Sequence, residues 1–386
     1  VYSDLGTSVS FVATLVSVPG SMQFRRAAGR THVYMVNQDI LRKIAPEITE
    51  LVEKRYIILR NIYFIQPVGR RALAARLRLP ERTVRNEVDV LREQGLLVSN
   101  PAGMAVTNTG ERILGELKEY VRELRGLSEL ERRLARILGL QQMIIVPGDS
   151  DTDETVKKEM AKATARYLKN VLKDGEVLAV TGGTTLAEVA ISFPTSMEKR
   201  DIMVVPARGG LGEEVEKQAN TVAANIAQHL GGVYRLLHVP DDVGDDVIAS
   251  LCSDPKIKDM LDLIKKADMV LHGIGSAEEM AKRRGLQESD LRLLAAHKAV
   301  GEAFGYYFNE QGDVVYSTSS VGLRMEDLMT INKVVAVGGG RSKAEAALAV
   351  MSNHYQHVCI TDEGAARLME ARLKGNSAVF DTPVRL

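Results

Sequence analysis

The sequence contains no tryptophan, and Phe, Trp and Tyr together make up only 5% of it, which argues against a carbohydrate site built from stacked aromatic rings. It has only two cysteines in 386 residues, Cys252 and Cys359. They cannot form a disulfide framework, so we expect a reducing, cytoplasmic environment. No apolar run approaches the ~20 residues that a membrane span requires, so no membrane partner is expected. Net charge is also absent, because 50 Lys and Arg balance 50 Asp and Glu.

The positive charges are nevertheless concentrated in one segment. Residues 54–92 contain ten basic and three acidic residues, an excess of seven positive charges. Such an asymmetry indicates a segment that binds a polyanion. A solvated helical face would explain the charge excess equally well, so the charge alone does not decide between the two.

The first 34 residues differ from the rest of the chain. They mix Ser, Gly, Val and an Arg-rich patch without a sustained period. The apolar stretch 9–18 is too short and too poorly flanked for a signal peptide. We interpret residues 1–34 as a non-native or disordered extension with Met35 as the natural start, and a genuine flexible arm is the alternative.

Residues 35–110 have the pattern of a winged helix-turn-helix domain. A short amphipathic helix begins near Val68, a three-residue break ends at Pro80, and a second helix ends at Gly95. Two apolar runs around the turn 100–103 predict a wing of two strands. In this motif the second helix enters the major groove of DNA while the first helix crosses the backbone.

The side chains that point outward from the second helix have the chemistry of DNA recognition. Arg82 and Arg85 can present guanidinium groups to guanine or phosphate, and Asn86 can pair with adenine. Short helical hairpins also occur in helix bundles, but the polar set, the wing and the local charge agree here. We therefore predict operator DNA as a partner, contacted by Arg70, Arg71, Arg82, Thr83, Arg85 and Asn86.

Residues 111–140 have apolar side chains at three- and four-residue steps, as helices do. Gly126 and a capping box from Ser128 to Glu131 predict that the stretch is divided into two helices. We interpret it as a linker and a dimer seam, because DNA-binding modules of this kind act in pairs. The expected assembly is a homo-oligomer, a dimer that forms a tetramer on DNA. An ordinary packed helix is the alternative.

Residues 141–386 have the pattern of a doubly wound, Rossmann-like α/β domain. Short runs of Val, Ile and Leu without alternation predict parallel strands that are buried on both faces, and helical segments lie between some of them. The predicted strands are 177–181, 202–206, 234–239, 269–273, 334–337 and 358–361. The predicted helices are 154–172, 213–230 and 343–351.

Glycine-rich turns follow several of these strands. They occur at 181–185, 206–212, 273–275 and 338–343, and they carry hydroxyl groups or are accompanied by cationic side chains. Glycines let the backbone approach an anion, and a following helix N-terminus adds N–H donors and a favourable dipole. Together these turns favour a site for a doubly phosphorylated small molecule. Neither the P-loop nor the dinucleotide-binding glycine pattern is present.

His354 and His357 have only Cys359 nearby in the sequence and no fourth ligand in view. A structural zinc site requires four such ligands. We therefore interpret both as surface histidines and predict no metal.

Many sequence motifs in order resemble the SorC/DeoR-type sugar-responsive bacterial repressors. The resemblance runs from about Met35 to the end of the chain. Its motifs are Pro67-Val-Gly-Arg-Arg, Ser150-Asp151, Val156-Lys-Lys-Glu-Met, Thr181-Gly-Gly-Thr-Thr, Val205-Pro-Ala-Arg-Gly-Gly-Leu-Gly, Gln218-Ala-Asn-Thr, His272-Gly-Ile-Gly, Glu302-Ala-Phe-Gly-Tyr-Tyr-Phe-Asn, Ser342-Lys-Ala-Glu-Ala and Thr361-Asp-Glu-Gly-Ala-Ala.

This resemblance implies a repressor of glycolytic genes, with a winged-helix domain joined to an effector domain of the sugar-phosphate isomerase and glucosamine-phosphate deaminase type. It implies no cofactor. The implied effector is fructose 1,6-bisphosphate, with fructose 6-phosphate, glucose 6-phosphate and dihydroxyacetone phosphate as competitors.

The resemblance also assigns roles to individual residues. Thr184, Thr185 and Lys343 would hold one phosphate, and Arg208 and Arg283 would hold the other. Gln218 and Glu302 would lie near sugar hydroxyls. The whole implied ligand-binding set is Gly182, Gly183, Thr184, Thr185, Arg208, Gly209, Gly210, Gln218, Arg283, Glu302, Ser342 and Lys343.

A catalytic role is the alternative, as a sugar-phosphate isomerase or deaminase fused to a DNA-binding domain. The similar deaminases follow Gly-Ile-Gly with an Asp-Gly-His-type stretch, whereas Gly275 is followed here by Ser-Ala-Glu-Glu. The acidic loop of the isomerases is also absent. Enediol chemistry needs a base near the sugar carbon. Glu302 could serve, but a hydrogen bond to a hydroxyl is its simpler role, so we predict that the protein is not an enzyme.

Overall fold

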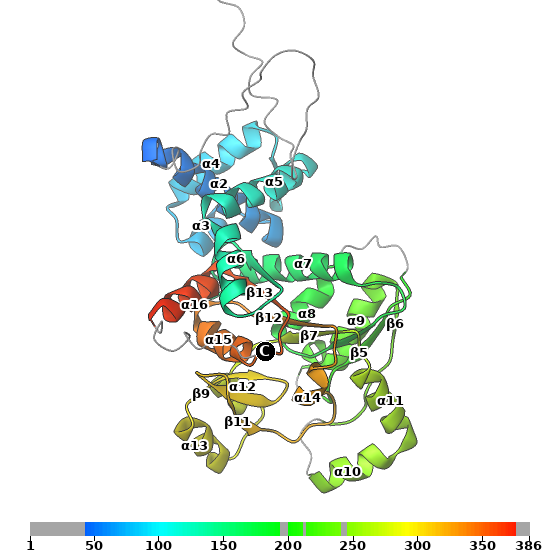
Figure 1. Cartoon of the computed structure of the whole chain (residues 1–386). Helices are drawn as coiled ribbons and strands as arrows, with labels where there is room; N and C mark the ends of the chain where they lie inside the picture. Colours follow the sequence, from blue (N-terminus) through cyan, green and yellow to red (C-terminus); the bar gives the residue numbers. More distant parts are fainter. Residues whose placement is uncertain (1–42, 194–199, 211–213, 241–244, 376–386) are drawn as a thin grey trace, which may run out of the picture. The chain divides into compact units, whose positions relative to one another are not determined.

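The computed structural model describes residues 43–193, 200–210, 214–240 and 245–375 (Figure 1). The described chain forms two compact units, one that ends at Leu124 and one that begins at Arg125. The predicted extension, residues 1–34, lies outside the described residues.

The first unit contains four helices and one hairpin within its described part. These are α2 (Pro46–Ile65), α3 (Arg70–Leu77), α4 (Glu81–Glu93), β1 (Leu97–Asn100), β2 (Gly103–Val106) and α5 (Asn108–Leu124). Strands β1 and β2 pair in antiparallel fashion around the predicted turn. A single apolar core joins all of these elements, and Val84, Val88 and Leu91 of α4 face it.

The turn between α3 and α4 is short and locally determined. Arg78 ends α3 in the left-handed conformation, with φ of +52°, and its N–H donates to the carbonyls of Ala74 and Ala75. Pro80 then precedes the first residue of α4, and Gly95 follows that helix with φ of +72°. These residues hold α4 at a fixed angle to α3.

The stretch 111–140 is shared between the two units. Helix α5 packs against α2, whereas α6 (Leu127–Ile137) packs against β3 (Gln142–Val146) and α16 (Glu363–Gly375). The division at Gly126 is as expected, but the predicted capping box is wrong: α6 begins at Leu127 after a left-handed Gly126. The Glu131 carboxylate instead accepts a hydrogen bond of 2.6 Å from the backbone N–H of Ile145 in β3.

The second unit is built on a seven-stranded parallel sheet in the order β3-β13-β12-β7-β4-β5-β6. The prediction did not include β3, and it placed 234–239 in a strand that covers only Val233–Tyr234. The other strands lie within one residue of their predicted bounds. They are β4 (Val177–Val180), β5 (Met203–Pro206), β7 (Met269–Gly273), β12 (Lys333–Val337) and β13 (Val358–Asp362), and the short strand is β6 (Val233–Tyr234).

Helices cover both faces of this sheet. Successive strand residues point to opposite sides, so Leu178 and Val180 pack into one apolar cluster and Ala179 into the other. One face is covered by α7 (Glu154–Val171), α8 (Thr184–Ile191) and α9 (Ala219–Leu230). The other face is covered by α6, α11 (Pro255–Lys265), α15 (Ala344–Ser352) and α16.

A second, antiparallel sheet of four strands in the order β11-β10-β9-β8 lies between β7 and β12 in the sequence. Nothing in the hydrophobic pattern predicted it. Its strands are β8 (Gly275–Ser276), β9 (Ala299–Ala303), β10 (Tyr306–Asn309) and β11 (Val314–Ser317), and the nearby helices are α12 (Ala277–Arg283), α13 (Glu288–Ala296) and α14 (Met325–Leu328). Helix α10 (Asp245–Ser253) precedes α11. No helix in the described ranges is both long and apolar enough to cross a membrane.

The central strand β7 provides a test of the two-layer core. Leu271 is fully buried between the sheet and its helices, so Leu271→Ala should lower the free energy of unfolding by about 2–5 kcal/mol. Chemical denaturation would measure this. Met329→Ala, at an exposed position, should change the same free energy by less than about 0.5 kcal/mol. Equal effects of the two changes would contradict the described core.

Candidate functional site

A cleft lies where the order of the strands reverses. The chain leaves β4 toward β5 on one side and returns through β7 toward β12 on the other, although β4 and β7 are neighbours in the sheet. In such sheets the loops diverge at the carboxyl ends of these two strands and leave a crevice that binds ligands. Here the crevice contains about 770 Å³ not occupied by protein atoms, part of it open to solvent.

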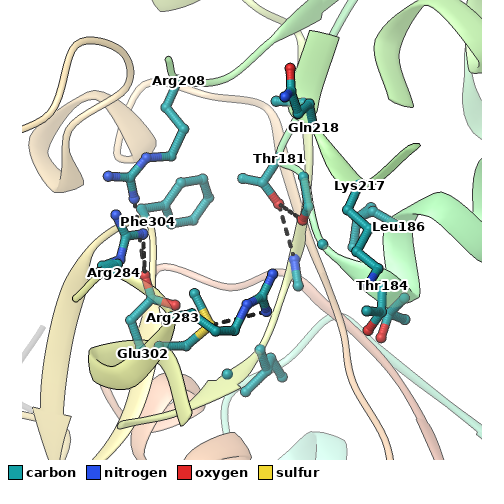
Figure 2. A pocket seen from close by; sticks show the side chains of 18 of the residues that line it. Thr181, Thr184, Leu186, Arg208, Lys217, Gln218, Arg283, Arg284, Glu302 and Phe304 are labelled. Carbon is teal, nitrogen blue, oxygen red and sulfur yellow. Dashed lines mark hydrogen bonds and ion pairs between the residues drawn. The ribbon is translucent and has the colours of Figure 1, made fainter. Parts of the chain in front are cut away.

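Ten of the twelve predicted ligand-binding residues line this cleft, and Gly210 and Ser342 do not (Figure 2). The lining also includes residues that the prediction missed, among them Lys217, Arg284 and Phe304. The complete lining is Thr181, Gly182, Gly183, Thr184, Thr185, Leu186, Arg208, Gly209, Lys217, Gln218, Ala219, Gly273, Ile274, Gly275, Met280, Arg283, Arg284, Glu302, Phe304 and Lys343.

One end of the cleft is formed by the start of α8. Gly182 packs directly against the backbone carbonyl of Lys217. If position 182 carried a side chain, its Cβ would lie 2.4 Å from that oxygen. The Gly183 N–H donates a hydrogen bond to the same carbonyl. Thr184 and Thr185 then open α8, so hydroxyls, N–H groups and the positive end of the helix dipole meet there. This combination suits an anion.

Lysines increase the positive charge at this end. Lys217 and Lys343 line the cleft. Half-buried Lys157 of α7 has a lowered pKa because burial, and then the neighbouring charge of Lys343, disfavours its charged form. Among the described residues, Lys217 pairs with the Glu214 carboxylate at 2.8 Å, and Lys343 lies 3.7 Å from the Glu279 carboxylate. A negative ligand would therefore relieve repulsion among these cations.

The other end of the cleft is formed by buried charges. Arg208, Arg284 and Glu302 have side-chain exposures of 6%, 2% and 6%. Arg284 Nη2 donates to Glu302 Oε1 at 3.1 Å, and Arg208 Nη1 lies 4.0 Å from the same oxygen. Arg283 extends between the two ends in the view of Figure 2. The cleft is thus cationic at both ends.

Ser342 and Gly210 have structural partners outside the cleft. The Ser342 hydroxyl and N–H donate to the Asp151 carboxylate at 2.9 and 2.7 Å. The buried Asp362 carboxylate accepts the Gly340 N–H at 2.7 Å, in the same loop. These bonds fix the loop that presents Lys343. The Gly210 N–H donates to the Val239 carbonyl at 3.0 Å.

The charge run Lys282-Arg283-Arg284 has three different environments. Lys282 is exposed and pairs with Glu278 at 2.6 Å, Arg283 lines the cleft, and Arg284 is buried against Glu302. The sequence pattern could not separate them. Lys217 was missed for a different reason: its only signal was its place immediately before the motif that starts at Gln218.

In the first unit, Arg82, Arg85 and Asn86 are exposed near the start of α4, and Thr83 is half-buried. Several basic side chains in this region have acidic partners. Arg70 donates to Asp89 at 2.9 Å, and the Glu81 carboxylate lies 3.4 Å from Arg85 and 3.6 Å from Arg71. Arg60 is buried and lies over the Tyr56 ring. These ion pairs neutralise part of the positive charge around α3 and α4.

Of the two histidines considered in the sequence, His354 is exposed and His357 is half-buried, and His357 Nδ1 accepts the Val334 N–H at 3.0 Å. Among the residues that the structure describes, no group of three or more His, Cys, Asp and Glu is arranged to hold a metal ion.

Two family models match the chain. One, described as a sugar-binding domain, matches residues 122–369, and the other, described as the CggR N-terminal DNA-binding domain, matches residues 51–121. The boundary between the two matches lies close to the boundary between the two compact units. The molecule is therefore a transcription regulator with a DNA-binding domain and a sugar-binding domain.

Individual relatives narrow this class. The central glycolytic genes regulator of Priestia megaterium is 47% identical over 330 residues, 85% of this chain and 96% of the relative. That of Bacillus subtilis is 42% identical over 326 residues, 84% of this chain and 96% of the relative. A SorC-family regulator structure from Enterococcus faecalis has a TM-score of 0.59 and 40% identity, and covers 63% of this chain and 99% of its own. The chain belongs to the SorC/DeoR family of bacterial sugar-responsive transcription regulators.

A solved structure of full-length SorC from Klebsiella pneumoniae has a TM-score of 0.59 and 20% identity, and covers 84% of this chain and 98% of its own. At that identity the likeness concerns the fold alone. The sugar-binding domain is the second unit, so the cleft described above lies in the domain that the family uses for its ligand.

A buried histidine supports the floor of the cleft. His272 of β7 is fully buried, and its ring lies 4.5 Å from that of Phe304, which lines the cleft. Its Nδ1 lies 3.0 Å from the Gly273 carbonyl and must donate to it, since a carbonyl only accepts. Burial lowers the pKa of His272 to about 4, so the ring is neutral at physiological pH.

This histidine predicts a pH dependence of stability. Between pH 6.5 and 4 the unfolded chain takes up a proton at His272 that the folded chain does not, so the free energy of unfolding should decrease as the pH falls. The decrease should be about 3 kcal/mol across this window. Denaturation at several pH values should show that His272→Gln removes it. His297→Gln, at an exposed site, should leave it, and an unchanged slope in His272→Gln would contradict the assignment.

Proposed function

We propose that the protein is a transcriptional repressor of glycolytic genes whose affinity for its operator is controlled by a phosphorylated sugar, fructose 1,6-bisphosphate in particular. The observation that carries this proposal is the distribution of charge in the cleft, with cations at both ends and, among the described residues that line it, a single carboxylate, Glu302. A sugar with a phosphate at each end matches this distribution. The regulators of glycolytic genes among the relatives support the gene class.

Each group in the cleft has a role in this proposal. One phosphate accepts hydrogen bonds from Thr184, Thr185 and the start of α8, with Lys217 and Lys343 neutralising its charge. The second phosphate binds Arg208 and Arg283. Gln218 and Glu302 contact the sugar hydroxyls, because an amide and a carboxylate are suitable partners for hydroxyl groups.

In the first unit we propose a winged helix-turn-helix with α4 as the recognition helix. Helix α3 and the left-handed turn at Arg78 precede it, and the β1–β2 hairpin that would form the wing follows it. Arg82, Arg85 and Asn86 are exposed near its start, the part of a recognition helix that contacts bases. DNA-binding units of this kind act in pairs, so we propose a dimer that forms a tetramer on the operator, in the cytoplasm.

A catalytic function is a weaker candidate. A general base in an isomerase must be positioned to take a proton from a sugar carbon. Glu302 Oε1 instead accepts bonds from Arg284 and from the Gly305 N–H at 2.6 Å, which suits a carboxylate that holds a ligand in place. Turnover of a sugar phosphate by the purified protein would revive the isomerase or deaminase alternative.

The effector can change operator affinity only if it binds the two conformations of the protein unequally. A change from 1:99 to 99:1 in their ratio needs about 5.5 kcal/mol of that difference. Charge-assisted bonds to two phosphates are strong enough to supply this if one conformation displaces a cation of the cleft.

Arg85→Ala should weaken operator binding by roughly 5- to 150-fold, as expected for the loss of about 1–3 kcal/mol from one guanidinium contact. Effector affinity should stay unchanged, because Arg85 lies in the other unit. Fluorescence anisotropy with labelled operator DNA measures the first quantity and calorimetry the second. Arg92→Ala is the matched control, an exposed arginine at the far end of α4. Equal losses in both variants would remove α4 from the recognition role.

Lys343→Ala should abolish or strongly weaken binding of fructose 1,6-bisphosphate and leave operator affinity intact, because it removes a cation from one end of the cleft. Lys282→Ala should have little effect, since that exposed lysine pairs with Glu278 away from the cleft. Calorimetry across fructose 1,6-bisphosphate, fructose 6-phosphate, glucose 6-phosphate and dihydroxyacetone phosphate would identify the preferred sugar. Unchanged affinity in Lys343→Ala would exclude this residue from the site.

A further inference from the structure

Beneath one end of the cleft, two buried guanidinium groups share one carboxylate. Arg208 and Arg284 both lie near Glu302 Oε1, at 4.0 and 3.1 Å, and all three side chains are more than nine-tenths buried. Glu302 is thus the carboxylate that both guanidinium groups face at this wall of the cleft. A buried charge keeps its position only if the surrounding structure holds it firmly.

A tight turn provides that support. Phe304 and Gly305 form the two-residue loop between β9 and β10, and both have positive φ, +55° and +82°. This is the geometry of a type I′ hairpin turn. The Gly305 N–H donates to Glu302 Oε1 at 2.6 Å, and the Gly305 carbonyl accepts the Thr318 N–H at 2.9 Å. The turn is therefore bonded directly to the buried carboxylate.

The same glycine also sets the position of Arg208. A Cβ at position 305 would lie 2.7 Å from both terminal nitrogens of Arg208 and 2.5 Å from the Thr318 hydroxyl. The guanidinium group thus packs flat against a backbone that has no side chain. Any larger residue at 305 must displace Arg208, in addition to the cost of its positive φ.

The two oxygens of Glu302 have different surroundings. Oε1 accepts the bonds from Arg284 and Gly305. Oε2 lies beside Gly275, which lines the cleft. It would be 3.3 Å from the Cβ of a residue with a side chain at position 275. Arg284 and the turn therefore orient the carboxylate so that one oxygen stays available on the side of the ligand.

We propose that Arg284 and Gly305 are positioning residues that determine specificity for a sugar bisphosphate over a sugar monophosphate. They hold Arg208 and Glu302 in place at the end of the cleft opposite Thr184. A ligand with two phosphates uses both ends at once, so its affinity depends on this support. A monophosphate can bind through the lysine-rich end alone and depends on it less. The inference rests on the proposed sugar-phosphate function of the cleft.

Gly305→Ala in the full-length protein tests the role of the turn, with fructose 1,6-bisphosphate and fructose 6-phosphate as probes in calorimetry. The bisphosphate affinity should fall at least tenfold and the monophosphate affinity should fall clearly less, with operator affinity unchanged. Gly175→Ala is the matched control, because Gly175 has φ of +87° but no atom within 4 Å of an added Cβ. Gly175→Ala has a similar energetic cost from its positive φ but brings no Cβ into contact with another residue. A bisphosphate affinity within twofold of that control would overturn the proposal.

Arg284 provides a second test that does not depend on the turn. Arg284→Met should reduce the ratio of bisphosphate to monophosphate affinity, and Arg284→Lys should restore part of it by returning a cation to Glu302. A purely structural role would lower both affinities together and leave their ratio unchanged. Arg292→Met removes an exposed arginine that pairs with Glu288 and should change neither affinity.

The outcomes separate this inference from the proposed function. If the unaltered protein binds neither sugar phosphate, both are wrong. If it binds and prefers the bisphosphate, and the variants at 284 and 305 keep that preference, the cleft binds the effector and only the positioning role is wrong. Loss of the preference in both variants, with the controls unchanged, is the expected result.

Discussion

The central constraint in this protein is a concentration of positively charged side chains at the carboxyl end of a parallel sheet. Arg208, Arg283, Arg284, Lys217 and Lys343 line one cleft, and in the part of the chain that the structure describes Glu302 is the one carboxylate in the lining. Like charges that line one cleft repel each other, and burial increases the repulsion because the protein interior screens it less than water does. The arrangement of these cations is stable because the fold keeps each of them in position. The cleft therefore favours an anion of matching size.

The two sheets contribute different parts of the cleft. The parallel sheet supplies the switch point between β4 and β7 and the start of α8, which together form a site for one anion. The antiparallel sheet β8–β11 supplies Glu302 and the Phe304–Gly305 turn, which fix the buried arginines. A parallel α/β sheet without this addition would have a single anion site at the helix N-terminus. Arg208 follows β5 of the parallel sheet and Arg284 follows α12, and the inserted sheet supplies the carboxylate and the turn that hold them at the second end of the cleft.

Much of this could be predicted from the sequence, for identifiable reasons. Strands β4, β7, β12 and β13 are mostly apolar runs that are buried on both faces, and the glycines after β4 and at the end of β7 mark the carboxyl ends where the cleft forms. The small sheet could not be predicted, because its strands have two to five residues and no regular pattern. The role of Arg284 could not be predicted either, because only the fold shows that its environment differs from that of Lys282, two positions earlier.

The two units use charge in different ways. In the first unit the ion pair at the start of α4 is exposed: the Arg85 and Glu81 side chains are 57% and 41% accessible, so water and salt screen it and an external anion can replace the carboxylate at small cost. Affinity built from such contacts falls as salt is added. In the second unit the Arg284–Glu302 pair is almost fully buried and is screened far less. Binding there depends on the geometry of a small ligand, which suits a sugar-binding domain that must distinguish one ligand from another.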